Sequence, residues 1–207
     1  MSTPIPQILE LRMVNNMREV LISIKPKWCE LIVSGKKTVE VRKTKPKLET
    51  HFKVYIYCTK DNTFAEKTLR GFDENGKAIH YKANKGKVIG EFVCDHIDPF
   101  LCMPLAIFST IGTLEQTCLT AEQISKYFNG KNGYGWHITD LVVYDKPREL
   151  NEFKQVRSIR GYHKETENFA QKLLHSTRLE VNFLKRPPQS WCYVKSTEPR
   201  QTADGHQ

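Results

Sequence analysis

The 207-residue chain contains no stretch that approaches the roughly 20 consecutive apolar residues needed to cross a bilayer as a helix. Its N-terminus also lacks a basic segment followed by an apolar run, the pattern of a signal peptide. These absences predict a cytoplasmic protein with no membrane partner. Hydrophobic residues make up 39% of the chain, enough for a core, and the length suits one domain with extensions or at most two small domains.

Closely spaced cysteines are also missing. None of the six cysteines forms a C-x-x-C pair, and most lie among apolar or strand-forming neighbours, as is typical of buried reduced thiols. The nearest approach to a metal cluster is Cys94, His96 and Cys102, and that spacing fits no standard zinc pattern. We therefore predict no metal and no other cofactor.

Acidic residues are too few to balance the basic ones. The chain has 32 lysines and arginines against 23 aspartates and glutamates, which leaves a net charge of +9. Such a charge bears on association rather than on fold, and it indicates a polyanionic partner. Nucleic acid is the predicted partner, and an anionic membrane surface is the weaker candidate.

A short helix is predicted near the N-terminal end of the most basic stretch. Pro26 is suited to the first helical position, where its missing N–H has no partner in any case. Trp28, Leu31 and Ile32 then recur at helical spacing and form one apolar face. Gly35 is suited to the left-handed residue that closes a helix.

The strand that follows the glycine, over residues 38–42, alternates between two faces. Val39 and Val41 share one face, and Glu40 and Arg42 share the other, where they are close enough to pair. The stretch is either a solvated strand edge guarded by lysines or the floor of an anion-binding site. The basic residues around Glu40 are Lys36, Lys37, Arg42, Lys43, Lys45 and Lys47.

Gly35, Lys37, Glu40 and Arg42 resemble the GxKxxExR signature of ASCH domains, which belong to the PUA-like superfamily. The strand and helix entry at residues 22–26 resemble the start of that family. The resemblance implies an α+β fold: a small mixed β-barrel flanked by helices, with an inserted hairpin and a helical C-terminal extension. The ending of the chain, around residues 186–194, resembles that of prophage-type members of the family.

The implied domain organisation has four parts. Residues 1–18 form an N-terminal extension, 19–153 the barrel domain, 154–195 a helical extension with a closing strand, and 196–207 a disordered tail. Within the barrel, residues 60–84 are an insertion, and Asn75-Gly76 between strand-like flanks predicts a hairpin there. The helix of the extension is predicted over 163–176.

Three later segments complete the prediction. Thr120 and Gln123 form a capping box that opens a helix. Trp136 and His137 lie side by side in a strand, so one should enter the core and the other should face the groove. Ser190, at the start of the closing strand, is placed to face the same groove as Glu40.

The most basic stretch predicts a cleft that binds single-stranded or looped RNA, because the bases of such RNA are free to stack on aromatic side chains. Cationic side chains would neutralise phosphates, and Glu40 would accept from a base amino group or orient Arg42. The candidate RNA-binding residues are Lys25, Trp28, Lys37, Glu40, Arg42, Lys43, Trp136, His137 and Ser190.

Two alternatives remain open. One is a hydrolase, because the resemblance extends to ribonuclease-like members and to an acetylcytidine amidohydrolase; the candidate catalytic residues are then Lys37, Glu40 and His137. Glu40 stands where that amidohydrolase has its threonine nucleophile, and Thr38 is displaced by two positions. The other alternative is a protein-interaction module of a transcription or translation regulator.

Overall fold

The computed structural model of the chain describes residues 19–60, 68–72, 78–82, 85–103, 106–108, 113–159 and 178–196. Three predicted segments lie outside these residues: the N-terminal extension, the helix over 163–176, and the tail except for Ser196.

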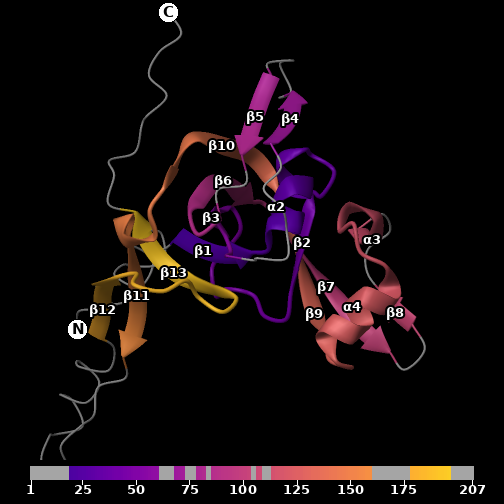
Figure 1. Cartoon of the computed structure of the whole chain (residues 1–207). Helices are drawn as coiled ribbons and strands as arrows, with labels where there is room; N and C mark the ends of the chain where they lie inside the picture. Colours follow the sequence, from indigo (N-terminus) through magenta and orange to yellow (C-terminus); the bar gives the residue numbers. More distant parts are fainter. Residues whose placement is uncertain are drawn as a thin grey trace, which may run out of the picture.

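The described residues form mostly strands, with few helices (Figure 1). The helices are α2 (Pro26–Val33), α3 (Thr113–Gln116), α4 (Ala121–Phe128) and the 3-10 turn η1 (Leu150–Glu152). The strands are β1 (Glu19–Ile24), β2 (Val39–Arg42), β3 (Phe52–Cys58), β4 (Thr68–Phe72), β5 (Ala78–Lys82), β6 (Val88–Cys94), β7 (Ile97–Met103), β8 (Ala106–Phe108), β9 (Gly133–His137), β10 (Thr139–Arg148), β11 (Phe153–Ile159), β12 (Arg178–Phe183) and β13 (Trp191–Ser196).

The larger sheet has the order β10-β6-β3-β1-β13-β11-β12. Its central strands β1 and β3 run parallel, and the chain between them passes through α2 and β2. Both strands are nearly continuous apolar runs because both of their faces are covered. Val20 and Ile22 enter one core cluster, whereas Leu21 and Tyr55 enter a second cluster on the opposite face.

The smaller sheet has the order β2-β9-β7-β8 and carries the signature strand. Val41 packs with Phe100 of β7 and with Ile124 and Phe128 of α4 in a third core cluster. The predicted capping box that starts α4 is confirmed: the Thr120 side chain accepts from Gln123 N, and Gln123 Oε1 accepts from Thr120 N.

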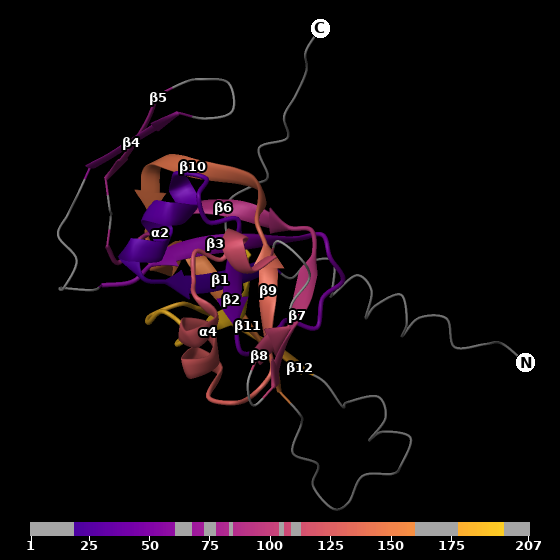
Figure 2. The ribbon, with the colours of Figure 1, turned by 90° about the vertical axis from the view of Figure 1, so that its right-hand side faces the viewer.

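The predicted hairpin is confirmed. Strands β4 and β5 pair antiparallel from Thr68↔Lys82 to Phe72↔Ala78, and they stand away from the other sheets (Figures 1 and 2). The predicted Asn75-Gly76 turn lies outside the described residues.

The closed barrel that we predicted is not found among the described residues, whose strands form separate sheets of seven, four and two strands. In the extension, the predicted helix over 163–176 lies outside the described residues, and strands flank it. Strands β11 and β12 pair with each other, and β11 pairs with β13, so the described parts of residues 154–195 extend the larger sheet. Local charge in this segment hid the alternation of its strands, whose pairing partners are distant in the sequence.

Two smaller observations concern bilayers and cysteines. No helix among the described residues has the length and apolar character to span a bilayer. The six cysteines are present as thiols, and Cys29, Cys58, Cys94 and Cys192 are buried, as predicted for reduced thiols. Burial raises the pKa of the Cys192 thiol to about 12, which keeps it protonated near neutral pH.

Candidate nucleic-acid interface

The signature residues meet around one carboxylate. Glu40 Oε1 lies 2.9 Å from Arg42 Nη2, and Glu40 Oε2 lies 3.3 Å from Lys37 Nζ. The alternation of β2 places Glu40 and Arg42 on the same face, and the Gly35 turn brings Lys37 back towards them. The structure therefore assembles Lys37, Glu40 and Arg42 into one group, which we call the ionic triad.

The ammonium of Lys37 has partners for all of its donors. Besides Glu40, it donates to the carbonyl oxygens of Val39 at 2.8 Å and Thr117 at 2.7 Å. An ammonium has three N–H donors, and Lys37 has three acceptors within 3.3 Å. Its hydrogen-bonding capacity is thus used within the protein, and it ties β2 to the residue that follows α3.

Arg42 connects the smaller sheet to the larger one. Its Nη2 atom donates to the carbonyl oxygen of Ser23 in β1 at 2.7 Å, and Nη1 donates to Ser190 Oγ at 3.4 Å. Ser190 lies just before β13, and its hydroxyl accepts from Arg42; that it faces a groove shared with Glu40 stays a prediction. The Nε atom of Arg42 is buried and has no hydrogen-bond partner among the residues that the structure describes.

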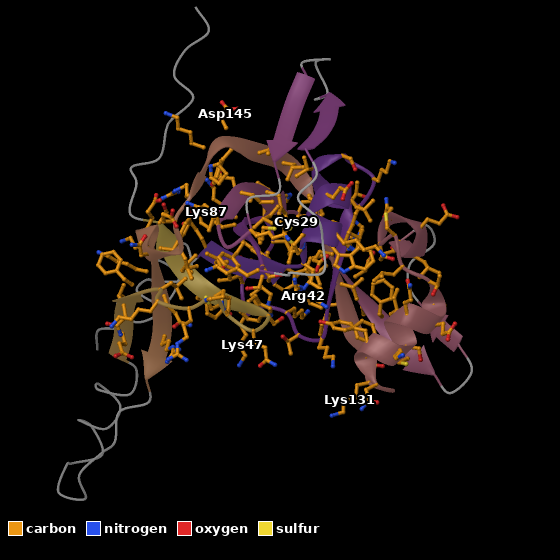
Figure 3. The ribbon with its side chains drawn as sticks, in the orientation of Figure 1. Cys29, Arg42, Lys47, Lys87, Lys131 and Asp145 are labelled. Carbon is orange, nitrogen blue, oxygen red and sulfur yellow. The ribbon has the colours of Figure 1, made fainter. Side chains whose placement is uncertain are left out.

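The ionic triad is buried, unlike the exposed cleft floor that we predicted. Lys37 is 2% exposed, Glu40 6% and Arg42 7%. Both faces of β2 are covered, because Trp28 of α2, Ser23 and Ser190 enclose the charged face and α4 covers the valine face. Figure 3 shows Arg42 near the centre of the molecule and Lys47 near its edge.

Exposed lysines stand beside aromatic rings around the buried triad. Lys43 Nζ lies 5.0 Å from the ring centre of Tyr127 in α4, and Lys45 Nζ lies 5.4 Å from that of Tyr134 in β9. Lys27 Nζ lies 4.9 Å from the ring centre of Trp28. In both views, α2, β2 and α4 follow one another along one side of the molecule (Figures 1 and 2). We call these six residues the basic–aromatic surface: Lys27, Trp28, Lys43, Lys45, Tyr127 and Tyr134.

Tyr127 links this surface to the ionic triad. Partial burial raises the pKa of its phenol, while the positive charge of Arg42 opposes that rise. The hydroxyl therefore stays protonated near neutral pH and can donate or accept a hydrogen bond. Its ring remains 39% exposed. The sequence analysis missed Tyr127 and Tyr134, because neither lies near the signature in sequence.

The remaining predicted residues are divided between different environments. Lys25 is exposed beside the start of α2. Trp136 is fully buried between Phe52 and Trp191, so it belongs to the core and offers no surface for a base. The reason is its register: Trp136 lies opposite Glu40, on the face that the larger sheet covers.

His137 points away from the ionic triad. It lies opposite Val39 in the β2–β9 pair, and neighbouring strand residues project to opposite faces. The three candidate catalytic residues therefore do not converge: Lys37 and Glu40 meet on one face, whereas His137 lies on the other. There, His137 Nε2 is 2.9 Å from Asp98 Oδ2, and His96 Nε2 is 2.8 Å from Asp98 Oδ1.

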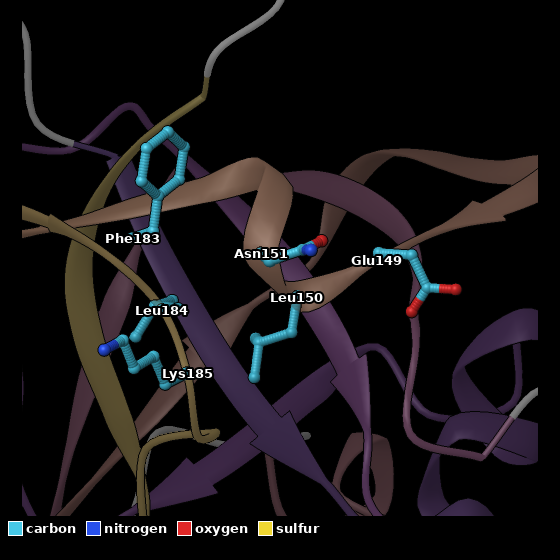
Figure 4. A pocket seen from close by; sticks show the side chains of 6 residues that line it. All are labelled: Glu149, Leu150, Asn151, Phe183, Leu184 and Lys185. Atoms are coloured by element: carbon cyan, nitrogen blue, oxygen red, sulfur yellow. The ribbon is translucent and has the colours of Figure 1, made fainter.

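A hollow of about 710 Å³ lies elsewhere, between η1 and the end of β12 (Figure 4). None of the predicted site residues lines it. Its lining residues are Glu149, Leu150, Asn151, Phe183, Leu184 and Lys185.

The model of the ASCH domain family matches residues 22–180 of the chain. The chain belongs to the ASCH domain family. This result confirms the family that the GxKxxExR residues indicated. Among curated proteins, a search by sequence finds no match.

Solved ASCH structures are similar to this ASCH domain. One is the crystal structure of ASCH from Zymomonas mobilis, at 23% identity, covering 64% of this chain and 73% of that chain with a TM-score of 0.45. A mutant form of the same Zymomonas mobilis protein is 20% identical, with coverage of 86% and 89% and a TM-score of 0.49.

Proposed function

We propose that this ASCH domain binds single-stranded or looped RNA over the basic–aromatic surface. The observation that carries the proposal is the placement of exposed lysines next to the exposed ring of Tyr127 and the half-buried ring of Tyr134. Residues 25–47 hold eight lysines and arginines and two glutamates, so the surrounding charge favours a polyanion. ASCH is a PUA-like family that is often proposed to bind RNA, which agrees with this assignment.

The two kinds of side chain have different roles in this proposal. Lysines neutralise phosphates and position the strand without reading its sequence. Rings stack on unpaired bases, and each such contact contributes about 1–3 kcal/mol. A duplex keeps its bases stacked inside and its deep groove closed to side chains, so the surface favours single strands or loops.

The predicted residues take two roles around this surface. Lys25, Trp28 and Lys43 contact RNA directly. Lys37, Glu40, Arg42 and Ser190 hold β2 in place, so that the chain leaving Arg42 presents Lys43 and Lys45 to the ligand.

The test is a titration of a fluorescently labelled single-stranded RNA, read by anisotropy, against wild-type protein and Tyr134→Leu. Loss of one stacking ring should weaken binding by about 5- to 150-fold, the equivalent of 1–3 kcal/mol. Phe183→Leu is the matched control, because Phe183 is 55% exposed but belongs to β12 at the edge of the larger sheet. Its affinity should equal that of the wild type.

Two results would contradict the proposal. Equal affinities for Tyr134→Leu and Phe183→Leu would show that the basic–aromatic surface is not the binding site. Binding of the corresponding duplex as tightly as the single strand would show that stacking of unpaired bases makes no contribution.

A further inference from the structure

Two histidines share one buried carboxylate on the face of β9 opposite the ionic triad. His96 Nε2 and His137 Nε2 each lie within 2.9 Å of a different oxygen of Asp98. The ring centres of the two histidines are 5.2 Å apart. Within the part of the chain that the structure describes, these three side chains are the group whose ligand-type atoms all lie within 4.8 Å of one another.

The pairing of β7 with β9 creates this cluster. Asp98 lies opposite Gly135, and His137 N donates to the carbonyl oxygen of His96 at 3.0 Å. The buried hydroxyl of Thr113 donates to Asp98 Oδ2 at 2.9 Å and so fixes the orientation of the carboxylate. Asp98 and His137 are held in paired strands and by a buried hydrogen bond, and His96, in the connection between β6 and β7, is tied to β9 through its backbone carbonyl.

We propose that His96, Asp98 and His137 bind one divalent transition-metal ion of the zinc type. Two imidazole nitrogens and one carboxylate oxygen are ligands that such ions accept. At metal–ligand distances of about 2.1 Å, tetrahedral geometry separates neighbouring ligand atoms by about 3.4 Å. To admit an ion, the present nitrogen–oxygen separations of 2.8 and 2.9 Å widen slightly, and the more distant ligand atoms, which all lie within 4.8 Å of one another, move closer together.

The burial of the three residues gives the proposed site a closed side and an open side. The Asp98 side chain is 6% exposed, that of His137 23%, and that of His96 63%. Because His96 faces solvent, an ion can enter from that side and keep a position for water or for an oxygen atom of a ligand. Sites with three protein ligands and one open position are typical of zinc that takes part in chemistry.

This proposal does not depend on RNA binding. The cluster lies on the His137 face of β9, whereas the ionic triad lies on the Trp136 face. It also departs from our prediction of no metal, which considered only local spacing: Asp98 and His137 are separated by 39 residues.

The test is a competition between the full-length protein and a chromophoric chelator for Zn²⁺. We expect one ion per chain for the wild type. We expect the affinity for Zn²⁺ to fall by more than about 100-fold in His137→Ala and in His96→Ala. This exceeds the usual effect of removing a group that only orients a ligand. His96→Ala is the decisive variant, because a side chain that is 63% exposed can be removed without loss of the fold. The matched control is His51→Ala, since His51 is exposed and lies outside the cluster.

The chain's cysteines are the competing ligands, so Co²⁺ provides a second measurement. The proposed site predicts a d–d absorption spectrum without a thiolate charge-transfer band. The proposal is overturned if wild-type protein fails to compete for Zn²⁺, if His96→Ala and His137→Ala bind as tightly as His51→Ala, or if the Co²⁺ spectrum shows thiolate ligation.

Discussion

Glu40 neutralises one of two buried cations, and no other carboxylate forms an ion pair with Lys37 or Arg42 in the described structure. A lysine and an arginine that are less than 10% exposed require such compensation, because removal of a charge from water is unfavourable. The backbone carbonyls that accept from Lys37 and Arg42 supply further partial charge. The residue at position 40 should therefore matter for stability, independently of any ligand.

We predict that Glu40→Gln lowers the free energy of unfolding by about 3–5 kcal/mol, because it leaves Lys37 and Arg42 buried without a counter-charge. Equilibrium unfolding in guanidinium chloride measures this change. Lys87→Gln is the matched control, since its ion pair with Glu149 is exposed and should contribute less than about 1 kcal/mol. Similar losses for the two variants would contradict the assignment of a special role to burial.

At the scale of elements, the α2–β2 connection is determined by local geometry. Ser34 N donates to Glu30 O, Gly35 N to Ile32 O and Lys37 N to Leu31 O, so the chain reverses over the last turn of α2. Gly35 adopts a φ of +71° there, as its place after the helix predicted. This single backbone angle directs the chain into β2 and so sets where Lys37 meets Glu40.

We predict that Gly35→Ala lowers the free energy of unfolding by about 1–2 kcal/mol, the cost of a left-handed conformation for a residue with a Cβ. Among the described residues beyond its chain neighbours, no atom lies within 4 Å of a Cβ placed at this position, so the loss has no steric part. Gly35→Asn should lower the free energy of unfolding by less than Gly35→Ala does, because asparagine tolerates the left-handed backbone region better. Chemical denaturation of the three proteins tests the order. A loss for Gly35→Asn that equals or exceeds that of Gly35→Ala would show that the backbone angle is not the cause.

At the scale of the whole molecule, charge is unevenly distributed. The net charge is +9, and residues 25–47 contribute six exposed lysines close to one another along the chain. Those lysines are Lys25, Lys27, Lys36, Lys43, Lys45 and Lys47. The buried arginine and lysine of the triad are neutralised in part by Glu40, so the exposed lysines dominate the field outside the protein.

This distribution predicts a strong salt dependence of RNA binding. If all six exposed lysines neutralise phosphates of a single strand, log K should fall against log[salt] with a slope of about −4. Replacing Lys43 and Lys45 by glutamine should make the slope less steep by about 1.4. Lys146→Gln is the control, because Lys146 is exposed in β10, a strand of the other sheet, and should leave the slope unchanged. A flat salt response for the wild type would contradict a phosphate-driven interaction.

Local features of the fold could be predicted from the sequence, whereas long-range pairings could not. Three predicted features depend on residues that lie a few positions apart: the helix after Pro26, the capping box at Thr120 and the hairpin around Asn75-Gly76. The structure contains the corresponding elements, which are α2, α4 and the β4–β5 pair. A closed barrel depends on which strands pair across the chain. In the described residues the strands instead form separate sheets, and β11 and β12 join the larger one.

By itself, the amino-acid sequence determined the family, the α2–Gly35–β2 unit and the excess of positive charge, because each follows from neighbouring residues. Only the tertiary structure decided which charges are buried and which histidines meet. Lys37 bonds to a carbonyl 80 residues away and Arg42 to a hydroxyl 148 residues away, so no local pattern indicates their burial. His96 and His137 likewise meet only because β7 pairs with β9, and the exposure and neighbours of a side chain depend on such contacts.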